Sequence, residues 1–406
     1  MNRDNGSPKR HCMVVYAHYP LGETRVQRQA EALIDAGFEV SVISLREKAT
    51  NEPAEENVNG VHVHRVPLDR RKRNNVIRLL IDYIVFFIVA TGTLTRLHLK
   101  HRYHIVQVHN LPDFLIFAGW FPKMLGTPII LDIHDLMPEF MISRSGGDMH
   151  SFKTRLMIWQ EQLSCRFADH VITVTDIWRQ TLIERGVPAE KVSVVMNVAD
   201  NRIFQNHTKS SHKDPIDCFK LIYHGLQVER YGLDLLLQAV ANLKNEIPNL
   251  HVLLHGNGEY HRTLKKIATE LGINDRVTFS TAYMDVAQLP EFLGTADVGI
   301  VPYRRDIFTD GILPTKLMEY VALGIPIIAA RTPIIERYFD STMVEFITPD
   351  NLAELEASIL KLYKDASLRQ KLVQNANKFN ETYSWAKTSK DYVNIVKDLH
   401  GSAPKR

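Results

Sequence analysis

The feature that most constrains the fold is an alternation of short apolar, β-rich runs with helical patterns. "CMVVYA" leads through a loop into residues 24–36, whose apolar side chains recur at helical spacing and which Gly37 ends. The further apolar runs of the first half are "FEVSVISL", "HIVQVHN", "TPIILDIHD", "DHVITVTD" and "VSVVMNV". Strands that alternate with helices predict a parallel, doubly wound sheet, in which ligands bind beyond the carboxyl ends of the strands.

The alternation occurs a second time after a polar interruption. The segment "NRIFQNHTKSSHKDPIDC" reads as a linker, and new strand candidates follow at "FKLIYHG", "LHVLLHGNGEY", "DRVTFS", "ADVGIVP", "IPIIAA" and "VEFITPD". A chain of 406 residues exceeds one comfortable core. We therefore predict an α/β protein with two Rossmann-like, doubly wound domains facing a central cleft. The predicted domains are residues 1–203 and 204–385, with a C-terminal helix over about 386–406 that packs back on the first domain.

Composition narrows the function classes. The formal net charge of +3 is small beside 23% charged residues, which argues against a nucleic-acid partner. The three cysteines lie far apart without a C-x-x-C pair, which disfavours a disulfide frame or a zinc knuckle. The polar start "MNRDNGSPKRH" is unlike a signal peptide, so we expect a cytoplasmic protein.

One segment bears on membrane contact: "RRKRNNVIRLLIDYIVFFIVATGTLTRLHLK". Its uninterrupted apolar run, Tyr83 to Ala90, is well short of the roughly 20 residues that a spanning helix needs. We predict a buried helix. An alternative stays open, in which the basic residues lie on anionic headgroups and the aromatic residues at the interface, as a peripheral contact with the cytoplasmic face of a membrane.

Several nucleotide and metal motifs are absent from the sequence. No G-x-G-x-x-G follows the first strand, and there is no G-x-x-x-x-G-K-[ST] loop. There is also no G-x-S-x-G elbow and no H-E-x-x-H pair. We therefore expect neither a resident cofactor nor a bound metal.

Two loop-to-helix junctions in the second half suit an anionic ligand. Lys316, in "FTDGILPTKLMEY", lies at the start of a predicted helix, where the helix dipole disfavours a cation by roughly 0.3–1 kcal/mol. An anion between the helix amides and the ammonium would offset that cost. At "YHGLQVERYGLD", Gly225 ends a strand and Arg230 precedes the next helix. The carboxylate of Glu319 would accept two ribose hydroxyls, or pair with Lys316 three residues earlier.

Eight ordered pieces together resemble a known family: "PLGETRVQRQAEALIDAGFEVSVI", "HIVQVHNLPDFLIFAG", "LDIHDLMPE", "ADHVITVTD", "YHGLQVERYGLDLLLQAV", "LLHGNGE", "ADVGIVPY" and "PTKLMEYVALGIPIIA". Over nearly its whole length the chain resembles the retaining glycosyltransferases of family 4, which have the two-domain GT-B fold. The resemblance implies that the second domain binds a nucleotide-diphosphate sugar and that the first holds the acceptor.

The resemblance also implies roles for individual residues. Glu319 is expected to bind the donor ribose, Arg230 and Lys316 the diphosphate, and His134 to lie over the reacting sugar. The implied donor-binding set is Gly22, Gly225, Arg230, Gly311, Ile312, Leu313, Lys316 and Glu319. The implied acceptor contacts are His109, Asn110 and Arg25. The implied catalytic set is His134, Arg230, Lys316 and Asp310, with no metal.

The chain departs from the family pattern in the first phosphate loop, before the linker and at a glutamate that it lacks. The family's first glutamate precedes the second by eight positions, and Gly311 stands there. Either the adjacent Asp310 substitutes for it, or the amides of residues 311–313 hold the sugar. Leu226 and Tyr231 stand where the family has cations, which leaves Arg230 as a displaced replacement. The family's Asn-Gly before the linker reads "MNVAD" here.

We therefore expect a retaining hexosyl- or N-acetylhexosaminyl-transferase of cell-surface polysaccharide assembly. In a front-face route, the departing phosphate oxygen takes the acceptor proton while the cations stabilise the leaving group. The acceptor is expected to be a glycan or a polyprenyl-linked glycan. Uridine and guanosine both remain open as the donor base. The competing hypotheses are a nucleotide-sugar epimerase of the same fold and a non-catalytic, membrane-associated subunit of a glycan assembly complex.

Overall fold

The chain forms two compact units. The structure, a computed structural model, describes residues 8–20, 23–46, 52–68, 76–205, 218–282 and 284–402. Unit 1 comprises Met1–Asn197 and Thr388–Arg406, and unit 2 comprises Val198–Lys387. The sequence predicted the divisions at 203/204 and 385/386. Most of the predicted linker, residues 206–217, lies outside the described residues.

Unit 1 is built on an eight-stranded sheet with the order β3-β4-β2-β1-β5-β6-β7-β8. The strands are Lys9–His18 (β1), Phe38–Leu45 (β2), Glu55–Val58 (β3), Val61–Val66 (β4), Ile105–His109 (β5), Ile129–Ile133 (β6), His170–Thr173 (β7) and Val192–Val194 (β8). All neighbours pair in parallel except β3 and β4, which are antiparallel.

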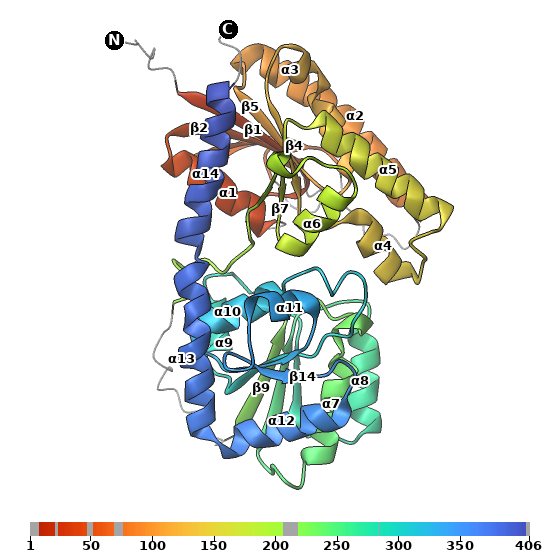
Figure 1. Ribbon diagram of the computed structural model, residues 1–406, viewed down its shortest axis with the longest axis vertical. Helices are drawn as coiled ribbons and strands as arrows, with labels where there is room; N and C mark the ends of the chain where they lie inside the picture. The colour runs from red at the N-terminus through yellow and green to blue at the C-terminus, as the bar shows by residue number, and fades with distance from the viewer. Residues whose placement is uncertain are drawn as a thin grey trace. The chain divides into compact units, whose positions relative to one another are not determined.

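Helices cover both faces of this sheet (Figure 1). They are Thr24–Asp35 (α1), Val76–His101 (α2), Trp120–Met124 (α3), Met137–Ser145 (α4), Phe152–Phe167 (α5), Asp176–Glu184 (α6) and Trp385–Ser402 (α14), with 3₁₀ helices Asp113–Gly119 (η1) and Ala189–Lys191 (η2). Side chains of β1 contribute to a hydrophobic core on each face of the sheet, because successive side chains of a strand point to opposite faces. Met13 and Val15 join the core under α1 and α14, whereas the ring of Tyr16 contacts Tyr83 and Phe86 of α2.

Unit 2 has a six-stranded parallel sheet with the order β11-β10-β9-β12-β13-β14. Its strands are Phe219–His224 (β9), Leu250–His255 (β10), Val277–Ser280 (β11), Val298–Val301 (β12), Ile327–Ala330 (β13) and Glu345–Ile347 (β14). Its helices are Leu233–Leu243 (α7), His261–Glu270 (α8), Leu289–Leu293 (α9), Thr315–Leu323 (α10), Pro333–Tyr338 (α11), Leu352–Lys364 (α12) and Ala366–Thr382 (α13), with 3₁₀ helices Glu229–Tyr231 (η3) and Asn274–Arg276 (η4).

The prediction of two doubly wound α/β domains is confirmed, and each apolar run named from the sequence contains a strand. The β3–β4 hairpin was missed. Its signal is the Asn59-Gly60 dipeptide, whose φ angles are 53° and 87°. Both central residues of a type I′ turn need positive φ, and Asn-Gly is the commonest pair to supply it.

The prediction that the apolar helix after the basic run is buried is wrong. α2 leaves much of its apolar surface exposed, and only 17% of its most apolar window, of mean hydropathy 1.6, is buried. Residues Arg78–His101 are long and apolar enough to cross a membrane by length and composition. The prediction counted only the unbroken run, but threonine and glycine extend the apolar stretch without adding charge. The basic run itself, residues 70–73, lies outside the described residues.

Candidate active site

Each sheet has one point where the strand order reverses, between β1 and β5 in unit 1 and between β9 and β12 in unit 2. At such a switch point the connections leave toward opposite sides and open a crevice beyond the strand ends, where α/β proteins bind ligands. The polar residues that follow these strands therefore define a candidate site in each unit.

In unit 2 the switch point holds Lys316 inside a group of three tyrosines. α10 begins directly after Pro314, which places Lys316 in the first helical turn, as predicted. The Lys316 Nζ lies 4.9 Å from the ring centroid of Tyr223 and 5.1 Å from those of Tyr231 and Tyr303. It also donates a hydrogen bond of 2.6 Å to the Tyr303 hydroxyl. Three aromatic faces stabilise a cation where water is excluded.

Two glycines permit this arrangement. Gly225, at the end of β9, has φ of +107°, and a Cβ there would lie 3.5 Å from Cε of Lys316. Gly232 has φ of +66°, and a Cβ there would lie 2.0 Å from the carbonyl oxygen of Pro302. Only glycine allows this approach of η3 to the end of β12. The approach stacks Tyr231 on Tyr303, with ring centroids 4.2 Å apart.

Burial dominates the electrostatics of Lys316. The side chain is only 7% exposed, and desolvation lowers its pKa to about 8, although the carboxylate of Glu319 acts in the opposite direction. A buried ammonium that has lost its water gains most from an anionic ligand, because the charge is already desolvated before the ligand arrives. The site is thus prepared for an anion.

Glu319 is oriented by a chain of hydrogen bonds from β9. Its Oε2 lies 2.5 Å from Nε2 of His224, and Nδ1 of His224 lies 3.0 Å from the Tyr320 hydroxyl. That hydroxyl in turn donates to the carbonyl oxygen of Ile222 at 3.2 Å. The carboxylate is part-buried, and its second oxygen can accept further hydrogen bonds.

The other residues expected in the donor site take up positions around this group. The Arg230 guanidinium lies 5.4 Å from the Tyr231 ring and 5.2 Å from the Phe308 ring. Asp310 pairs with Arg305 at 2.7 Å. The amides of Gly311 and Ile312 donate to the carbonyl oxygen of Phe308 at 3.1 Å. The loop before α10 thus uses these two amides for its own turn.

In unit 1 the end of β6 carries His134 above a buried polar network. His109 Nδ1 and His134 Nε2 are 3.1 Å apart, so one donates to the other. Burial lowers the pKa of His134 to about 3, which keeps the imidazole neutral at physiological pH. His109 itself is fully buried. The side chain of Asn110 is engaged by Asp113, by the carbonyl oxygen of Asp135 and by the His134 amide.

The network is centred on Asp132. Burial acts to raise the pKa of its carboxyl, but the Arg25 guanidinium, together with a hydrogen bond from His109, outweighs burial and holds the pKa well below its usual value. Arg25 contacts both carboxylate oxygens and donates to the carbonyl oxygen of Val195 at 2.8 Å. Arg25 is only 2% exposed, so this geometry argues against the predicted acceptor contact. Its charge instead compensates Asp132.

The nitrogens of His109 and His134 and an oxygen of Asp132 lie within 4.8 Å of one another, a spacing that a metal ion could bridge. Arg25, however, already supplies the positive charge that Asp132 requires, and it does so through both carboxylate oxygens. A divalent cation would therefore have to displace, or lie against, a buried guanidinium.

Glu23 is an acid that the sequence reasoning did not select. Its Oε1 lies 3.9 Å from Nδ1 of His134. Burial raises its pKa to about 7, while Arg25 acts to lower it. The predicted loop glycine nearby, Gly22, lies outside the described residues.

Comparison with known proteins decides the family. Residues 22–197 match a model described as a Glycosyl transferase 4-like domain, and residues 205–379 match one described as Glycosyl transferases group 1. The chain belongs to the GT-B glycosyltransferases of the family 4 type. The expected enzyme class is thereby confirmed.

Relatives of this glycosyltransferase span nearly its whole length. An uncharacterized glycosyltransferase of Methanocaldococcus jannaschii is 24% identical, over 91% of this chain and 92% of its own. The chitobiosyldiphosphodolichol beta-mannosyltransferase of Candida albicans is 21% identical, over 92% and 85%.

Solved structures share the fold. The sucrose-phosphate synthase of Thermosynechococcus elongatus has a TM-score of 0.78 at 18% identity, over 97% of this chain and 100% of its own. The Anabaena HepE protein, solved in complex with UDP-glucose, has a TM-score of 0.71 at 17% identity, over 96% and 99%.

The sequence reasoning missed several residues that surround the candidate site residues. Tyr303 is the second residue after β12, and His224 is the last residue of β9. Both could have been found if the residues at strand ends had been examined in the second half of the chain, as they were in the first. Tyr223 lies inside a strand, and no local pattern in the sequence distinguishes it from a core residue. Asp132 is an acid within the apolar run "TPIILDIHD", which is a signal of a buried charge pair that the sequence reasoning did not use.

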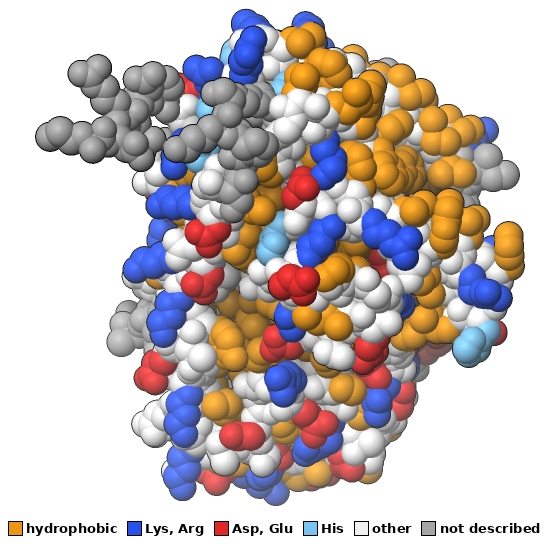
Figure 2. All heavy atoms as spheres, turned by 45° about the horizontal axis from the view of Figure 1, so that its top comes forward, with side chains coloured by type: hydrophobic (Ala, Val, Ile, Leu, Met, Phe, Trp, Pro, Cys, Tyr) orange, Lys and Arg blue, Asp and Glu red, His pale blue; other side chains and the backbone are white. Residues whose placement is uncertain are grey.

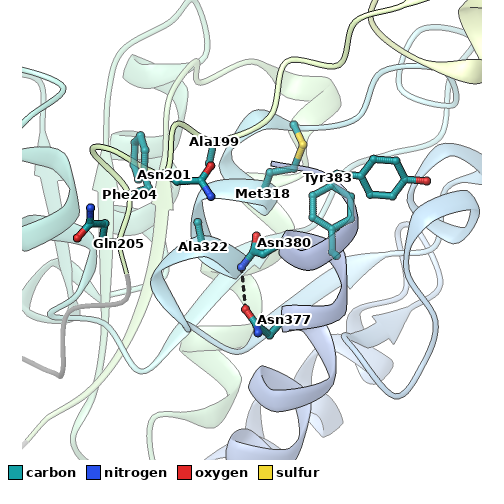
Figure 3. Close-up of a pocket in the computed structure, with 10 residues that line it drawn as sticks. Ala199, Asn201, Phe204, Gln205, Met318, Ala322, Asn377, Asn380 and Tyr383 are labelled. Carbon is teal, nitrogen blue, oxygen red and sulfur yellow. Dashed lines mark hydrogen bonds between the residues drawn. The ribbon is translucent and has the colours of Figure 1, made fainter. Parts of the chain in front are cut away.

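A cavity of about 260 Å³ in unit 2 is separate from these groups (Figure 3). Met318 and Ala322 of α10 line it, and at 100° per residue they lie on the side of that helix away from Lys316. Its three asparagines are engaged: Asn380 donates to Asn377 and to a carbonyl oxygen, and Asn201 accepts from the Trp385 amide. Among the residues that the structure describes, no charged side chain lines this cavity, so this lining lacks the chemistry of a diphosphate site.

Proposed function

We propose that this glycosyltransferase moves a hexosyl or N-acetylhexosaminyl group from a nucleotide-diphosphate sugar to a glycan or polyprenyl-linked acceptor, with retention of configuration. The observation that carries the proposal is the buried Lys316 at the unit 2 switch point, with Glu319 one turn further along the same helix. A desolvated cation beside a part-buried carboxylate suits a diphosphate joined to a ribose.

For the donor, we assign the diphosphate to Lys316 and Arg230 and the ribose hydroxyls to Glu319. The η3 turn places Arg230 next to the tyrosines that surround Lys316. HepE, which shares this fold, was solved in complex with UDP-glucose. That complex supports a nucleotide sugar as the ligand class. Uridine and guanosine diphosphate sugars are both candidates.

For the chemistry, we favour the front-face route. The leaving phosphate oxygen accepts the acceptor's hydroxyl proton as the glycosidic bond to the nucleotide breaks and the new one forms on the same face. Lys316 and Arg230 stabilise the negative charge that develops on the leaving diphosphate. Neither a cofactor nor a divalent ion is needed, because two cations and the first amides of α10 supply the charge compensation. His134, neutral and held by His109, positions the sugar or the acceptor.

For the biological setting, we propose cell-surface polysaccharide assembly on the cytoplasmic face of a membrane. Partial relatives include proteins named as an amylovoran biosynthesis glycosyltransferase of Erwinia amylovora and a putative colanic acid biosynthesis glycosyltransferase of Escherichia coli. A polyprenyl-linked acceptor would bring the enzyme to the membrane, and the exposed apolar surface of α2 fits a peripheral contact there.

A nucleotide-release assay tests the function. The protein is incubated with UDP- and GDP-sugars, with and without a chelator, and the sugar products are examined by NMR. The proposal expects slow nucleotide release, transfer with a retained anomeric configuration once an acceptor is supplied, and no effect of chelation. Isomerised sugar would identify an epimerase, and binding without release would identify a non-catalytic subunit. An inverted product or chelator-sensitive turnover would refute the mechanism.

A further inference from the structure

The exposed large hydrophobic residues of the described chain are concentrated on one side of unit 1. They lie on α2, on or directly after α3, and on α5, and Leu226 of unit 2 is the single exception. They are Leu80, Ile81, Ile84, Val85, Ile88, Val89 and Leu99 on α2, Trp120, Met124 and Leu125 at α3, and Phe152, Leu156 and Trp159 on α5. Figure 2 shows hydrophobic side chains gathered at the upper right, where Figure 1 places these helices. An apolar surface of this extent marks an interaction site.

One side of α2 packs against the rest of unit 1, and the other side is exposed. Phe86, Ala90, Leu94 and Leu97 recur at spacings of four and three residues and are buried. Next to this seam, Phe87 contacts Phe114 of η1, with ring centroids 5.9 Å apart. At 100° per residue, the exposed residues Ile81, Ile84, Val85 and Ile88 lie on the opposite side of the helix, and the exposed Leu80 lies at the edge of that side. A helix held along one seam by the protein cannot cross a bilayer without leaving unit 1.

α5 adds an aromatic stripe with a basic edge. Phe152, Leu156 and Trp159 recur at spacings of four and three residues, and their exposed fractions are 80%, 51% and 56%. The exposed cations Arg155 and Arg166 lie beside this stripe. Amphipathic helices that lie in the plane of a membrane interface have this composition, with aromatic residues on the apolar side and Lys or Arg along its border.

The three helices form one surface because both long helices pack on η1, which continues directly into α3. The only acids in α2, α3 and α5 are Asp82 and Glu161. Glu161 is buried and accepts hydrogen bonds from Arg185. The border of the surface is therefore basic. Its exposed cations are Arg78, Arg96, Lys100, Lys153, Arg155 and Arg166, of which Arg96 lies 4.0 Å from the exposed Glu55 carboxylate of β3.

We propose that α2, α3 and α5 together form a membrane-docking surface that seats unit 1 on an anionic lipid leaflet, with the α5 aromatic residues at the boundary between headgroups and acyl chains. This inference deepens the peripheral location in the proposed function and rests on it. The basic residues at the border favour an anionic membrane over a second copy of the chain as the partner of this surface. Two copies of the chain joined through this surface would bring their basic borders together, whereas anionic headgroups complement them.

The intrinsic fluorescence makes a direct test. Of the four tryptophans, Trp178 and Trp385 are buried at 2% and 6% exposure, whereas Trp120 and Trp159 lie on the docking surface. The full-length protein is mixed with phosphatidylcholine vesicles that do or do not contain phosphatidylglycerol. We expect sedimentation with the anionic vesicles, a blue shift of the emission, and quenching by lipids brominated on the acyl chain. Sedimentation without quenching would overturn the apolar contact, and absence of sedimentation would overturn docking.

Matched variants locate the surface. The double variant F152S/W159S should weaken binding to anionic vesicles by about tenfold or more, because two exposed aromatic residues are lost from the interface. Leu226→Ser, at 50% exposure in unit 2, should leave binding unchanged. Arg155→Glu should weaken binding, whereas Lys266→Glu in unit 2 should not. Equal binding of the wild-type protein and F152S/W159S would overturn the proposal. So would a concentration-dependent dimer that F152S/W159S abolishes, because a second copy would then occupy the surface.

Nucleotide release without vesicles separates this inference from the proposed function. F152S/W159S and Arg155→Glu should release nucleotide at the wild-type rate, because they lie outside the unit 2 site. A wild-type protein that docks on vesicles but releases no nucleotide would refute the function and leave the surface intact. One that turns over but ignores vesicles would refute the surface alone.

Discussion

Replacement of Lys316 by methionine tests the physical basis of the donor site. The substitution keeps a flexible, apolar stem among Tyr223, Tyr231 and Tyr303 and removes only the charge. Of the three ammonium protons, one is donated to Tyr303, and two remain for a ligand. A unit charge 4 Å from a phosphate oxygen contributes about 4 kcal/mol at an effective dielectric constant of about 20.

The expected loss of affinity is smaller than that Coulomb energy. Charge-assisted hydrogen bonds contribute about 1.5–3 kcal/mol net, so Lys316→Met should raise the Kd for nucleotide diphosphates by about ten- to a hundredfold. The affinity should also depend on pH. Because burial lowers the pKa of Lys316 to about 8, the fraction of protein that carries the charge falls as the pH rises through 8. The wild-type Kd should therefore rise about tenfold between pH 7 and pH 9.

Isothermal titration calorimetry with UDP and GDP at pH 7, 8 and 9 measures both effects. In Lys316→Met the Kd should be high and should lack this rise, since no ammonium remains to titrate. Lys265→Met is the matched control, because Lys265 is exposed and also lies over an aromatic ring, 5.7 Å from that of Phe279, in the same unit. It should behave like the wild-type protein. If Lys316→Met binds with the wild-type Kd and the same pH profile, the assignment of the diphosphate to this lysine fails.

Three further predictions concern the two sites. Arg25→Met leaves the Asp132 carboxylate buried without its main counter-charge, and should lower the free energy of unfolding by about 3–5 kcal/mol in chemical denaturation; a loss below about 1 kcal/mol would contradict this view. The folded-state pKa of Glu23, raised to about 7 from 4.5, means that its contribution to stability is fully present below pH 4.5 and is lost as the pH rises through 7. Glu23→Gln should therefore raise stability at pH 8 by about 1–2 kcal/mol after allowance for partial exposure, with little change at pH 4; equal melting curves at both pH values would refute the shift. Gly225→Ala, at φ of +107° and 3.5 Å from the Lys316 side chain, should weaken nucleotide binding about tenfold and cost about 1–2 kcal/mol of stability, and wild-type affinity would show that the loop tolerates a side chain.

Local sequence patterns predicted the order of the helices and strands well, but they predicted less well what surrounds individual side chains and helices. The position of Lys316 in the first turn of α10 followed from Pro314 and the apolar spacing after it. The environment of Arg25 did not follow, because its partner Asp132 is 107 residues away. Likewise, α2 was predicted as buried, since a helix that is apolar on all sides carries no sign of which side the protein covers.

The sequence by itself determined the two doubly wound units, the polar interruption between them and a cation at a helix start, because period, turn residues and strand ends are local properties of the chain. Tertiary structure decided what surrounds that cation. Tyr223, Tyr231 and Tyr303 come from three separate segments and meet around Lys316 only because the strand order reverses between β9 and β12. It also decided which apolar helices face outward, because burial depends on what packs against a helix and not on its composition.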